Sequence, residues 1–191
     1  MDKEKLIIYI HGFASSGNGT KAQLFKQHFK DITYLNPSLS HIPQLAIETL
    51  ENIISAFQAH YEIILMGSSL GGYYTLYLSQ KYHLRAILIN PAIKSHATLK
   101  KYEGLNPSFF DGSRFEMTLK HLEFLHTLEC QEVHAQEKIL LLLQKGDAVL
   151  DYKDALNKLP KVNIVLEEGG DHGFCDIEKH FERIDSFLET K

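Results

Sequence analysis

Gly67-Ser68-Ser69-Leu70-Gly71-Gly72 is the stretch of this chain that decides the fold. It follows the apolar run Ile63–Met66, which is typical of a buried strand, and leads into a helix expected over 70–81. A Gly-x-Ser-x-Gly pattern between a strand and a helix is typical of a nucleophile elbow, a turn sharp enough to strain the serine backbone. The glycines two residues before and after the serine supply the small positions that such a turn needs. The pattern predicts that Ser69 is a nucleophile; a Gly/Ser-rich turn without chemistry is the alternative.

The composition is that of an ordinary globular protein. The chain has 191 residues, of which 44% are hydrophobic and 23% charged, and its net charge is −4. This length is most simply one domain, 1–191. The charge gives no electrostatic reason to expect a nucleic-acid partner. No apolar stretch approaches the roughly 20 residues of a membrane span, so we expect no membrane partner.

The N-terminus and the cysteines predict a cytoplasmic protein. Residues 1–5 run directly into an apolar strand and lack the apolar core of a signal peptide. The two cysteines, Cys130 and Cys175, lie far apart in the sequence. Without an export signal, we expect them to be free thiols in a reducing compartment.

Apolar runs that alternate with helical periods predict an α/β fold. Strands are expected at five nearly continuous apolar runs: 6–10, 63–66, 86–89, 139–143 and 162–166. A weaker apolar run, 32–35, is a sixth candidate strand. Continuous hydrophobicity suits a parallel sheet that is covered on both faces. Helices are expected at 20–29, 46–57, 70–81, 152–159 and 177–188. We therefore expect a mostly parallel, doubly wound sheet with right-handed crossovers.

One interval, 91–137, interrupts this alternation. It contains no convincing strand, and its part 115–128 has a helical pattern. It carries six large apolar residues: Tyr102, Leu105, Phe109, Phe110, Phe115 and Met117. An insertion between core strands often covers a site, so we expect a short cap whose aromatic residues line an apolar acyl pocket. The alternative is that these residues pack onto the sheet as ordinary core.

A serine nucleophile needs a base that takes its proton, and His172 is the best placed of the eleven histidines. It follows the last expected strand, in a loop where flanking glycines let the imidazole approach a neighbouring loop. We expect His172 to be the base. A surface histidine without function is the alternative.

The base in turn needs an acid that orients it, and we expect this acid after the strand 139–143. Asp147 directly follows a glycine at the strand end, where its carboxylate can turn inward to an imidazole. Asp151 is the main alternative, although it is better placed to cap the helix that follows. The resulting chain order of Ser69, Asp147 and His172 is that of α/β-hydrolases.

Acyl transfer also needs N–H donors for the developing oxyanion. His11-Gly12-Phe13 closes the first expected strand, and a loop rich in Gly and Ser follows it. We expect the backbone N–H groups of Phe13 and Leu70 to converge on the oxyanion. His11 is expected to shape the loop, with a buried structural histidine as the alternative.

Other site chemistries have less support. His121, His126, Cys130 and His134 do not form a compact metal-binding pattern, because a spacing of five puts the first two on different helix faces. No G-x-x-x-x-G-K-[ST] phosphate loop occurs. We therefore expect neither a metal nor a cofactor.

At these motifs the chain resembles the YqiA/YcfP-type esterases, which are small bacterial α/β-hydrolases. The segments that carry the resemblance are His11–Phe13 with Ser15-Ser16 and Lys21-Ala22, Gly67–Tyr74, Asn90–Ala92, Gly146-Asp147 with Val149–Tyr152, and Glu168–Gly170 with His172 and Phe174. The resemblance covers essentially the whole chain. It implies an α/β-hydrolase fold, the triad Ser69, Asp147 and His172, and esterase activity on short acyl esters and acyl-CoA thioesters. The chain departs from the family's usual residues outside the triad, at Ala14, Gly17, Ser95, Ala148 and Asp171.

The hypothesis from sequence is thus a serine hydrolase that cleaves a small-molecule acyl ester or acyl-CoA thioester through an acyl-enzyme. An acyltransferase or a peptidase with the same triad is an alternative. So is a non-catalytic binding protein on the same scaffold. No oligomeric state is predicted.

Overall fold

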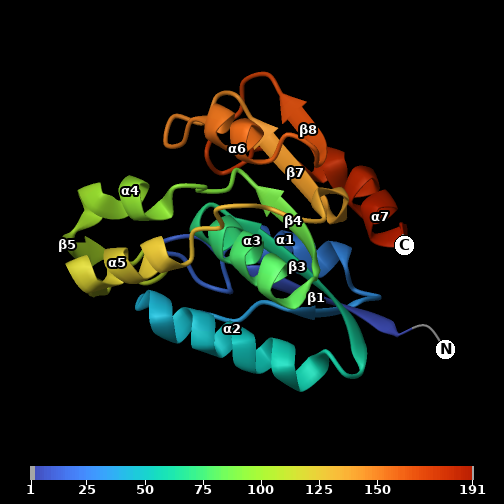
Figure 1. The fold of residues 1–191 in the computed structure, drawn as a ribbon, viewed down its shortest axis with the longest axis horizontal. Helices are drawn as coiled ribbons and strands as arrows, with labels where there is room; N and C mark the ends of the chain where they lie inside the picture. Colours follow the sequence, from blue (N-terminus) through green and yellow to red (C-terminus); the bar gives the residue numbers. More distant parts are fainter. Residues whose placement is uncertain (1–2, 191) are drawn as a thin grey trace.

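A six-stranded parallel sheet forms the centre of the computed structural model, which describes residues 3–190 (Figure 1). Its strands are β1 (Glu4–Ile10), β2 (Thr33–Leu35), β3 (Tyr61–Ser68), β4 (Arg85–Ile89), β7 (Ile139–Gln144) and β8 (Asn163–Glu167). They pair in the order β2-β1-β3-β4-β7-β8, and every pairing is parallel. All six runs that were expected to be strands belong to this sheet, so the predicted α/β class is confirmed.

Helices cover both faces of the sheet. On one face lie α2 (Pro43–Phe57), α3 (Leu70–Tyr82) and α6 (Tyr152–Lys158); on the other lie α1 (Thr20–His28) and α7 (Phe181–Glu189), which follows the short η3 (Ile177–His180). Successive strand residues point to opposite faces. Leu6 and Ile8 therefore contact the first group of helices, and Ile7 and Tyr9 contact the second. Among the residues described, no helix is long and apolar enough to cross a membrane.

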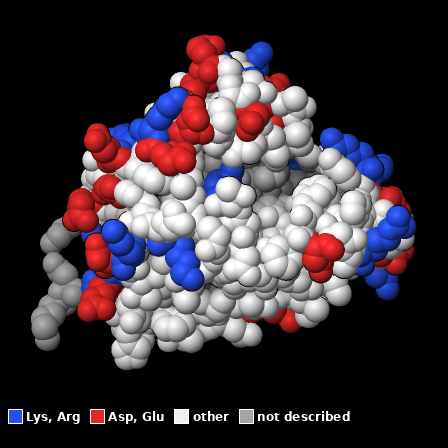
Figure 2. Space-filling model, turned by 180° about the vertical axis from the view of Figure 1, so that it is seen from behind, with Lys and Arg blue, Asp and Glu red and all other residues white. Residues whose placement is uncertain are grey.

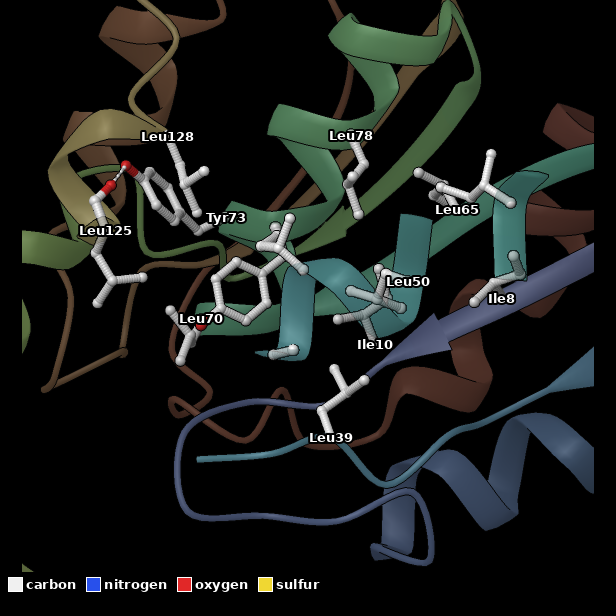
Figure 3. Close-up of a cluster of buried hydrophobic side chains, with 14 of the residues drawn as sticks. Ile8, Ile10, Leu39, Leu50, Leu65, Leu70, Tyr73, Leu78, Leu125 and Leu128 are labelled. Carbon is white, nitrogen blue, oxygen red and sulfur yellow. Dashed lines mark hydrogen bonds between the residues drawn. The ribbon is translucent and has the colours of Figure 1, made fainter. Parts of the chain in front are cut away.

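The core under α2 and α3 fixes the elbow helix against the sheet. Figure 3 shows fully buried side chains from four elements meeting there: Ile8 and Ile10 of β1, Leu65 of β3, Leu50 of α2 and Leu78 of α3. Tyr73 of α3 extends this cluster, and its hydroxyl donates a 2.7 Å hydrogen bond to the Leu125 carbonyl. The helix that begins at the elbow is thereby tied to the insertion.

The insertion 91–137 forms a separate set of elements beside the sheet. These are α4 (Ser95–Leu99), η1 (Lys100–Tyr102), β5 (Gly104–Pro107), β6 (Arg114–Met117), α5 (Leu119–Thr127) and η2 (Gln136–Lys138). β5 and β6 pair as an antiparallel hairpin, so the expectation that this interval contains no strand is wrong. The helix expected from 115 begins only at Leu119, because the Thr118 side chain accepts the N–H of His121 in a capping box.

Candidate active site

The elbow between β3 and α3 holds Ser69 in a strained conformation. Its φ of 56° and ψ of −121° lie in a region that residues other than glycine rarely adopt. Two backbone hydrogen bonds keep it there. The Ser69 N–H donates to the Ile89 carbonyl at 3.1 Å, and the Ser69 carbonyl accepts the Ala92 N–H at 3.0 Å. The end of β4 therefore supports the elbow directly.

Close backbone contacts explain the glycines around Ser69. A Cβ at Gly67 would lie 2.2 Å from the Gly71 carbonyl oxygen, and a Cβ at Gly71 would lie 2.0 Å from the Ile10 carbonyl oxygen. Real Cβ atoms essentially never approach another atom so closely. A larger residue at Gly67 would force β3 away from the start of α3, and one at Gly71 would force α3 away from β1.

Ser69, His172 and Asp147 form one hydrogen-bonded chain. His172 Nε2 lies 2.9 Å from Ser69 Oγ, and His172 Nδ1 lies 2.7 Å from Asp147 Oδ2. Because an ionised carboxylate only accepts hydrogen bonds, Nδ1 carries the ring proton and Nε2 can accept one from the serine. The structure thus brings together the three residues that the sequence predicted as nucleophile, base and acid.

The turn after β7 holds the Asp147 carboxylate in place. Its Oδ1 accepts the N–H groups of Val149 at 2.8 Å and Leu150 at 2.9 Å, and its side chain is only 2% exposed. Burial favours the neutral acid, but the hydrogen bonds from His172, Leu150 and Val149 outweigh this effect and lower the Asp147 pKa. Asp147 therefore faces His172 as a carboxylate.

Asp151, the alternative acid, has a different partner. Its side chain accepts the N–H of Lys153 at 2.9 Å and caps the N-terminus of α6. The loop after β7, which carries Asp147 (the acid loop), contacts the loop after β8, which carries His172 (the base loop), at glycine residues. There the Gly146 N–H donates to the Gly169 carbonyl at 2.6 Å. A Cβ at Gly146 would lie 2.4 Å from the Gly170 carbonyl oxygen, so only glycine allows this approach.

Two buried amide side chains, Asn90 and Gln144, hold the loop that carries His172. Asn90 Nδ2 donates to the carbonyls of Asp171 at 2.9 Å and His172 at 3.3 Å, and its Oδ1 accepts the Gln144 N–H at 3.0 Å. Gln144 Oε1 accepts the Asp171 N–H at 3.1 Å, and Nε2 donates to the Cys175 carbonyl at 2.9 Å. Neither residue was expected from sequence to support the site. The signal that could have found them is a lone polar residue at the end of an apolar strand.

The first loop passes directly beside Ser69. A Cβ at Gly12 would lie 3.2 Å from Ser69 Cβ. Phe13 and Leu70 line the same pocket as Ser69. Among the residues described, neither of their backbone N–H groups donates a hydrogen bond within the protein. Both groups are therefore free to bind an oxygen atom near the serine.

His11 shapes this loop, as expected. Its side chain is buried, its Nε2 accepts the Leu39 N–H at 2.9 Å, and its Nδ1 donates to the Gly12 carbonyl at 2.9 Å. Burial lowers the His11 pKa, against the smaller opposing effect of the Gly12 carbonyl, so the ring is held neutral. Because both ring nitrogens are occupied, His11 has no free atom with which to act as a base.

A pocket of about 420 Å³ opens beside Ser69. Figure 2 shows a hollow in the molecular surface that is bordered mainly by uncharged residues. The insertion contributes five of the lining residues: Ala92, Thr98, Leu99, Tyr102 and Phe109. Of the six large apolar residues singled out in the insertion, Tyr102 and Phe109 therefore line the pocket, whereas Met117 is buried in the core.

Lys21 of α1 is the one Lys or Arg among the lining residues. Its Nζ donates to the carbonyl of Gly173, the residue after His172. Burial lowers the Lys21 pKa to about 8, although the charge of Asp171 acts in the opposite direction. No separate role was expected for Lys21 from the sequence.

A family model described as "Uncharacterised protein family (UPF0227)" matches residues 6–189. The chain belongs to this family. UPF0227 protein PM0825 of Pasteurella multocida is 26% identical over 193 residues, covering 96% of this chain and 99% of the relative. UPF0227 protein YcfP of Salmonella gallinarum is 22% identical over 188 residues, covering 95% and 98%. The resemblance to YcfP-type proteins that the motifs indicated is confirmed.

Solved structures identify the fold of this UPF0227 chain. Mouse alpha/beta hydrolase domain-containing protein 10 has a TM-score of 0.76 at 19% identity, covering 96% of this chain and 89% of the mouse chain. Est1E from Butyrivibrio proteoclasticus, in a structure with ferulic acid bound, has a TM-score of 0.71 at 13% identity, covering 97% and 88%. The UPF0227 chain has the α/β-hydrolase fold, as the order of its motifs predicted.

Proposed function

We propose that this UPF0227 protein is a serine hydrolase that cleaves acyl esters or acyl-CoA thioesters. The observation that carries the proposal is the hydrogen-bonded chain from Ser69 through His172 to Asp147, of which Ser69 and His172 line a largely apolar pocket. The fold supports it, since Est1E, which shares this fold, has been solved with ferulic acid, a carboxylic acid, bound. The pocket volume of about 420 Å³ lies within the usual range for small-molecule sites.

The first half of the proposed reaction forms an acyl-enzyme. Ser69 Oγ attacks the acyl carbonyl carbon while His172 Nε2 takes the hydroxyl proton, and Asp147 stabilises the imidazolium that results. The N–H groups of Phe13 and Leu70 bind the oxyanion. The bond to the leaving alcohol or thiol then breaks as His172 returns its proton to the leaving group.

The second half releases the acid. Water attacks the acyl carbon, and His172 Nε2 takes the water proton. The bond between Ser69 Oγ and the acyl carbon breaks, and His172 returns the proton to the serine. The products are one carboxylic acid and one alcohol or thiol, and the enzyme regains its starting form.

Replacement of Ser69 tests this mechanism. Turnover of nitrophenyl esters and acyl-CoAs of graded acyl length is measured for the wild-type chain and for Ser69→Ala. We expect the variant to lose on the order of 10⁴- to 10⁶-fold in kcat, because the nucleophile is gone. Ser186→Ala is the matched control, because it removes an exposed serine hydroxyl of α7. Unchanged turnover in folded Ser69→Ala protein would contradict the proposal.

The same preparations distinguish the alternative activities. A serine-reactive fluorophosphonate is expected to label the wild type and Ser186→Ala but not Ser69→Ala. The absence of labelling in native protein would favour a non-catalytic binding protein. Faster turnover of a peptide amide than of any ester would indicate a peptidase. Product that depends on an added alcohol or amine acceptor would indicate an acyltransferase.

A further inference from the structure

Three side chains with metal-binding atoms meet in the insertion, and none of them lines the pocket beside Ser69. His96 lies on α4, His126 lies in the last turn of α5, and Glu129 follows the end of that helix. One donor atom of each residue lies within 4.8 Å of the donor atoms of the other two. Glu129 Oε2 is 3.6 Å from His96 Nδ1 and 3.4 Å from His126 Nδ1.

These donor atoms lie close together, but their hydrogen-bonding capacity is not fully used. Among the residues described, the buried His96 Nδ1 has no hydrogen-bond partner, and neither histidine is within good hydrogen-bonding geometry of Glu129. The two imidazole rings are tilted by 53° to each other, with centroids 4.3 Å apart. A buried ring nitrogen without a partner is unfavourable and calls for a specific explanation. A cation bound between the three groups would satisfy all of them at once.

We propose that His96, His126 and Glu129 bind a divalent transition metal, with zinc as the representative ion. Two imidazole nitrogens and one carboxylate form a donor set found in zinc sites with three protein ligands and one water. Imidazole ligands also favour zinc, copper or nickel over magnesium or calcium. Donors at about 2.0–2.1 Å from a tetrahedral ion lie about 3.3 Å from one another. The observed separations of 3.4 and 3.6 Å are therefore close to the required geometry.

The arrangement of the helices suits such a site. His126, in the last turn of α5, and Glu129, just after that helix, are three residues apart, while His96 comes from α4, which packs against α5. Lys94, the residue before α4, has its ammonium 2.7 Å from Asp154, which is its ion-pair partner. A bound ion would join α4 to α5. Since α4 also places Thr98 and Leu99 in the pocket wall, the ion would fix that wall.

The sequence pattern alone does not bring these three residues together. Of them, only His126 belongs to the set His121, His126, Cys130 and His134 that was weighed from sequence; Glu129 is not in that set, and His96 lies thirty residues before His126. His121 instead has its Nδ1 occupied by the Thr118 N–H in the capping box.

Zinc titration of the untagged, metal-stripped full chain tests the proposal. Isothermal titration calorimetry is expected to show one tight site per chain. His126→Ala and Glu129→Gln are expected to weaken binding by on the order of 100-fold or more. The His126 side chain is 63% exposed, so its removal leaves the fold intact. His60→Ala is the matched control, because this exposed histidine lies between α2 and β3, outside the cluster.

Two further measurements use the same variants. Cobalt(II) bound in place of zinc is expected to give the visible absorption of a four-coordinate ion in the wild type but not in His126→Ala. Ser69→Ala is expected to bind zinc as the wild type does, because the cluster is separate from the triad. Failure of the wild type to bind zinc with one-to-one stoichiometry would overturn the proposal, as would equal affinity in wild type, His126→Ala and Glu129→Gln.

Discussion

At the scale of single residues, a few backbone and side-chain hydrogen bonds fix the geometry of the site. Ser69 keeps its positive φ because the end of β4 bonds both its N–H and its carbonyl. Asn90, also at positive φ, reaches two consecutive carbonyls of the base loop. Strain of this kind persists only where surrounding bonds over-determine the backbone, and it is common at functional sites. The two strained residues that directly follow β3 and β4 therefore serve one purpose, the placement of Ser69 against His172.

Lys21 gives the site a pH dependence that can be measured. Its ammonium donates to the Gly173 carbonyl, and it loses its proton as the pH rises through its pKa of about 8. We expect kcat/KM of the wild type to decline on the alkaline side near this pH, because the neutral amine holds the base loop more weakly. Lys21→Met is expected to be slower at pH 7, by about tenfold, and to lack this decline. Rate measurements from pH 6 to 10 on both proteins check this.

The pH dependence of the free energy of unfolding distinguishes this loss of activity from unfolding of the protein. A lysine in the unfolded chain titrates near pH 10.4, and Lys21 in the folded chain titrates near pH 8. Between these values the unfolded state binds more protons, so the contribution of Lys21 to the free energy of unfolding rises with pH. The alkaline loss of activity should thus occur without a loss of stability that depends on Lys21. An identical alkaline decline in Lys21→Met would show that another group is responsible.

At the level of elements, the roles of Asp147 and Asp151 follow from where each lies relative to β7 and α6. Asp147 lies in the turn after β7 and contacts His172, whereas Asp151 caps α6. Asp147→Asn should lower kcat by about 10³- to 10⁴-fold, because an amide cannot hold His172 in the required tautomer and charge state. Asp151→Asn should leave the rate and the stability nearly unchanged, because asparagine is an equally good cap. Steady-state rates and denaturant unfolding of this matched pair check both statements.

The Asp147 substitution should also change the acid side of the stability profile. Because the folded-state pKa is lowered, the stabilising contribution of Asp147 is present above its unfolded pKa, about 3.9, and is lost as the pH falls through the folded value. Asp147→Asn should lack this loss. A large rate defect in Asp151→Asn together with a normal rate in Asp147→Asn would reverse the assignment.

The sequence predicted those elements whose burial is continuous. The central strands β3, β4 and β7 are apolar along their length because both faces are covered, and their signal is unambiguous. β8 was expected to be equally buried, but at the edge of the sheet Ile164 and Leu166 are 38% and 39% exposed. Hydrophobicity alone does not distinguish an edge strand from a central one.

The hairpin β5–β6 was not predicted, because its strands are short and partly exposed. Its strands have four residues each, and Leu105 is 61% exposed, so no buried face repeats often enough to be visible. The sequence did predict the chain order of Ser69, Asp147 and His172, because each lies in a loop after an apolar strand. It did not predict Asn90 or Gln144 as loop supports, since their contacts depend on how β4 and β7 lie side by side.

Over the whole molecule, the pocket depends on contacts between segments that are distant in sequence. The Phe109 N–H donates to the Ala14 carbonyl at 2.7 Å, which joins the hairpin to the first loop. The Phe13 ring packs against Tyr102 and Phe115, with centroids 5.1 and 5.4 Å away. The insertion therefore supports the loop that carries one of the proposed oxyanion donors. A change in the shape of the insertion would therefore move the Phe13 N–H.

Two adjacent phenylalanines at the tip of the hairpin test whether the insertion selects the acyl chain. Phe109 and Phe110 are 73% and 59% exposed, but only Phe109 lines the pocket. Phe109→Ala should raise KM for longer acyl esters by up to about tenfold, because an apolar contact of about 1–1.5 kcal/mol is lost, and should leave acetate esters nearly unchanged. Phe110→Ala is the matched control and should follow the wild type at every chain length. Equal KM profiles for the two variants across the ester series would show that the Phe109 ring does not contact the acyl chain, because both residues are exposed phenylalanines of the same hairpin and only Phe109 lines the pocket.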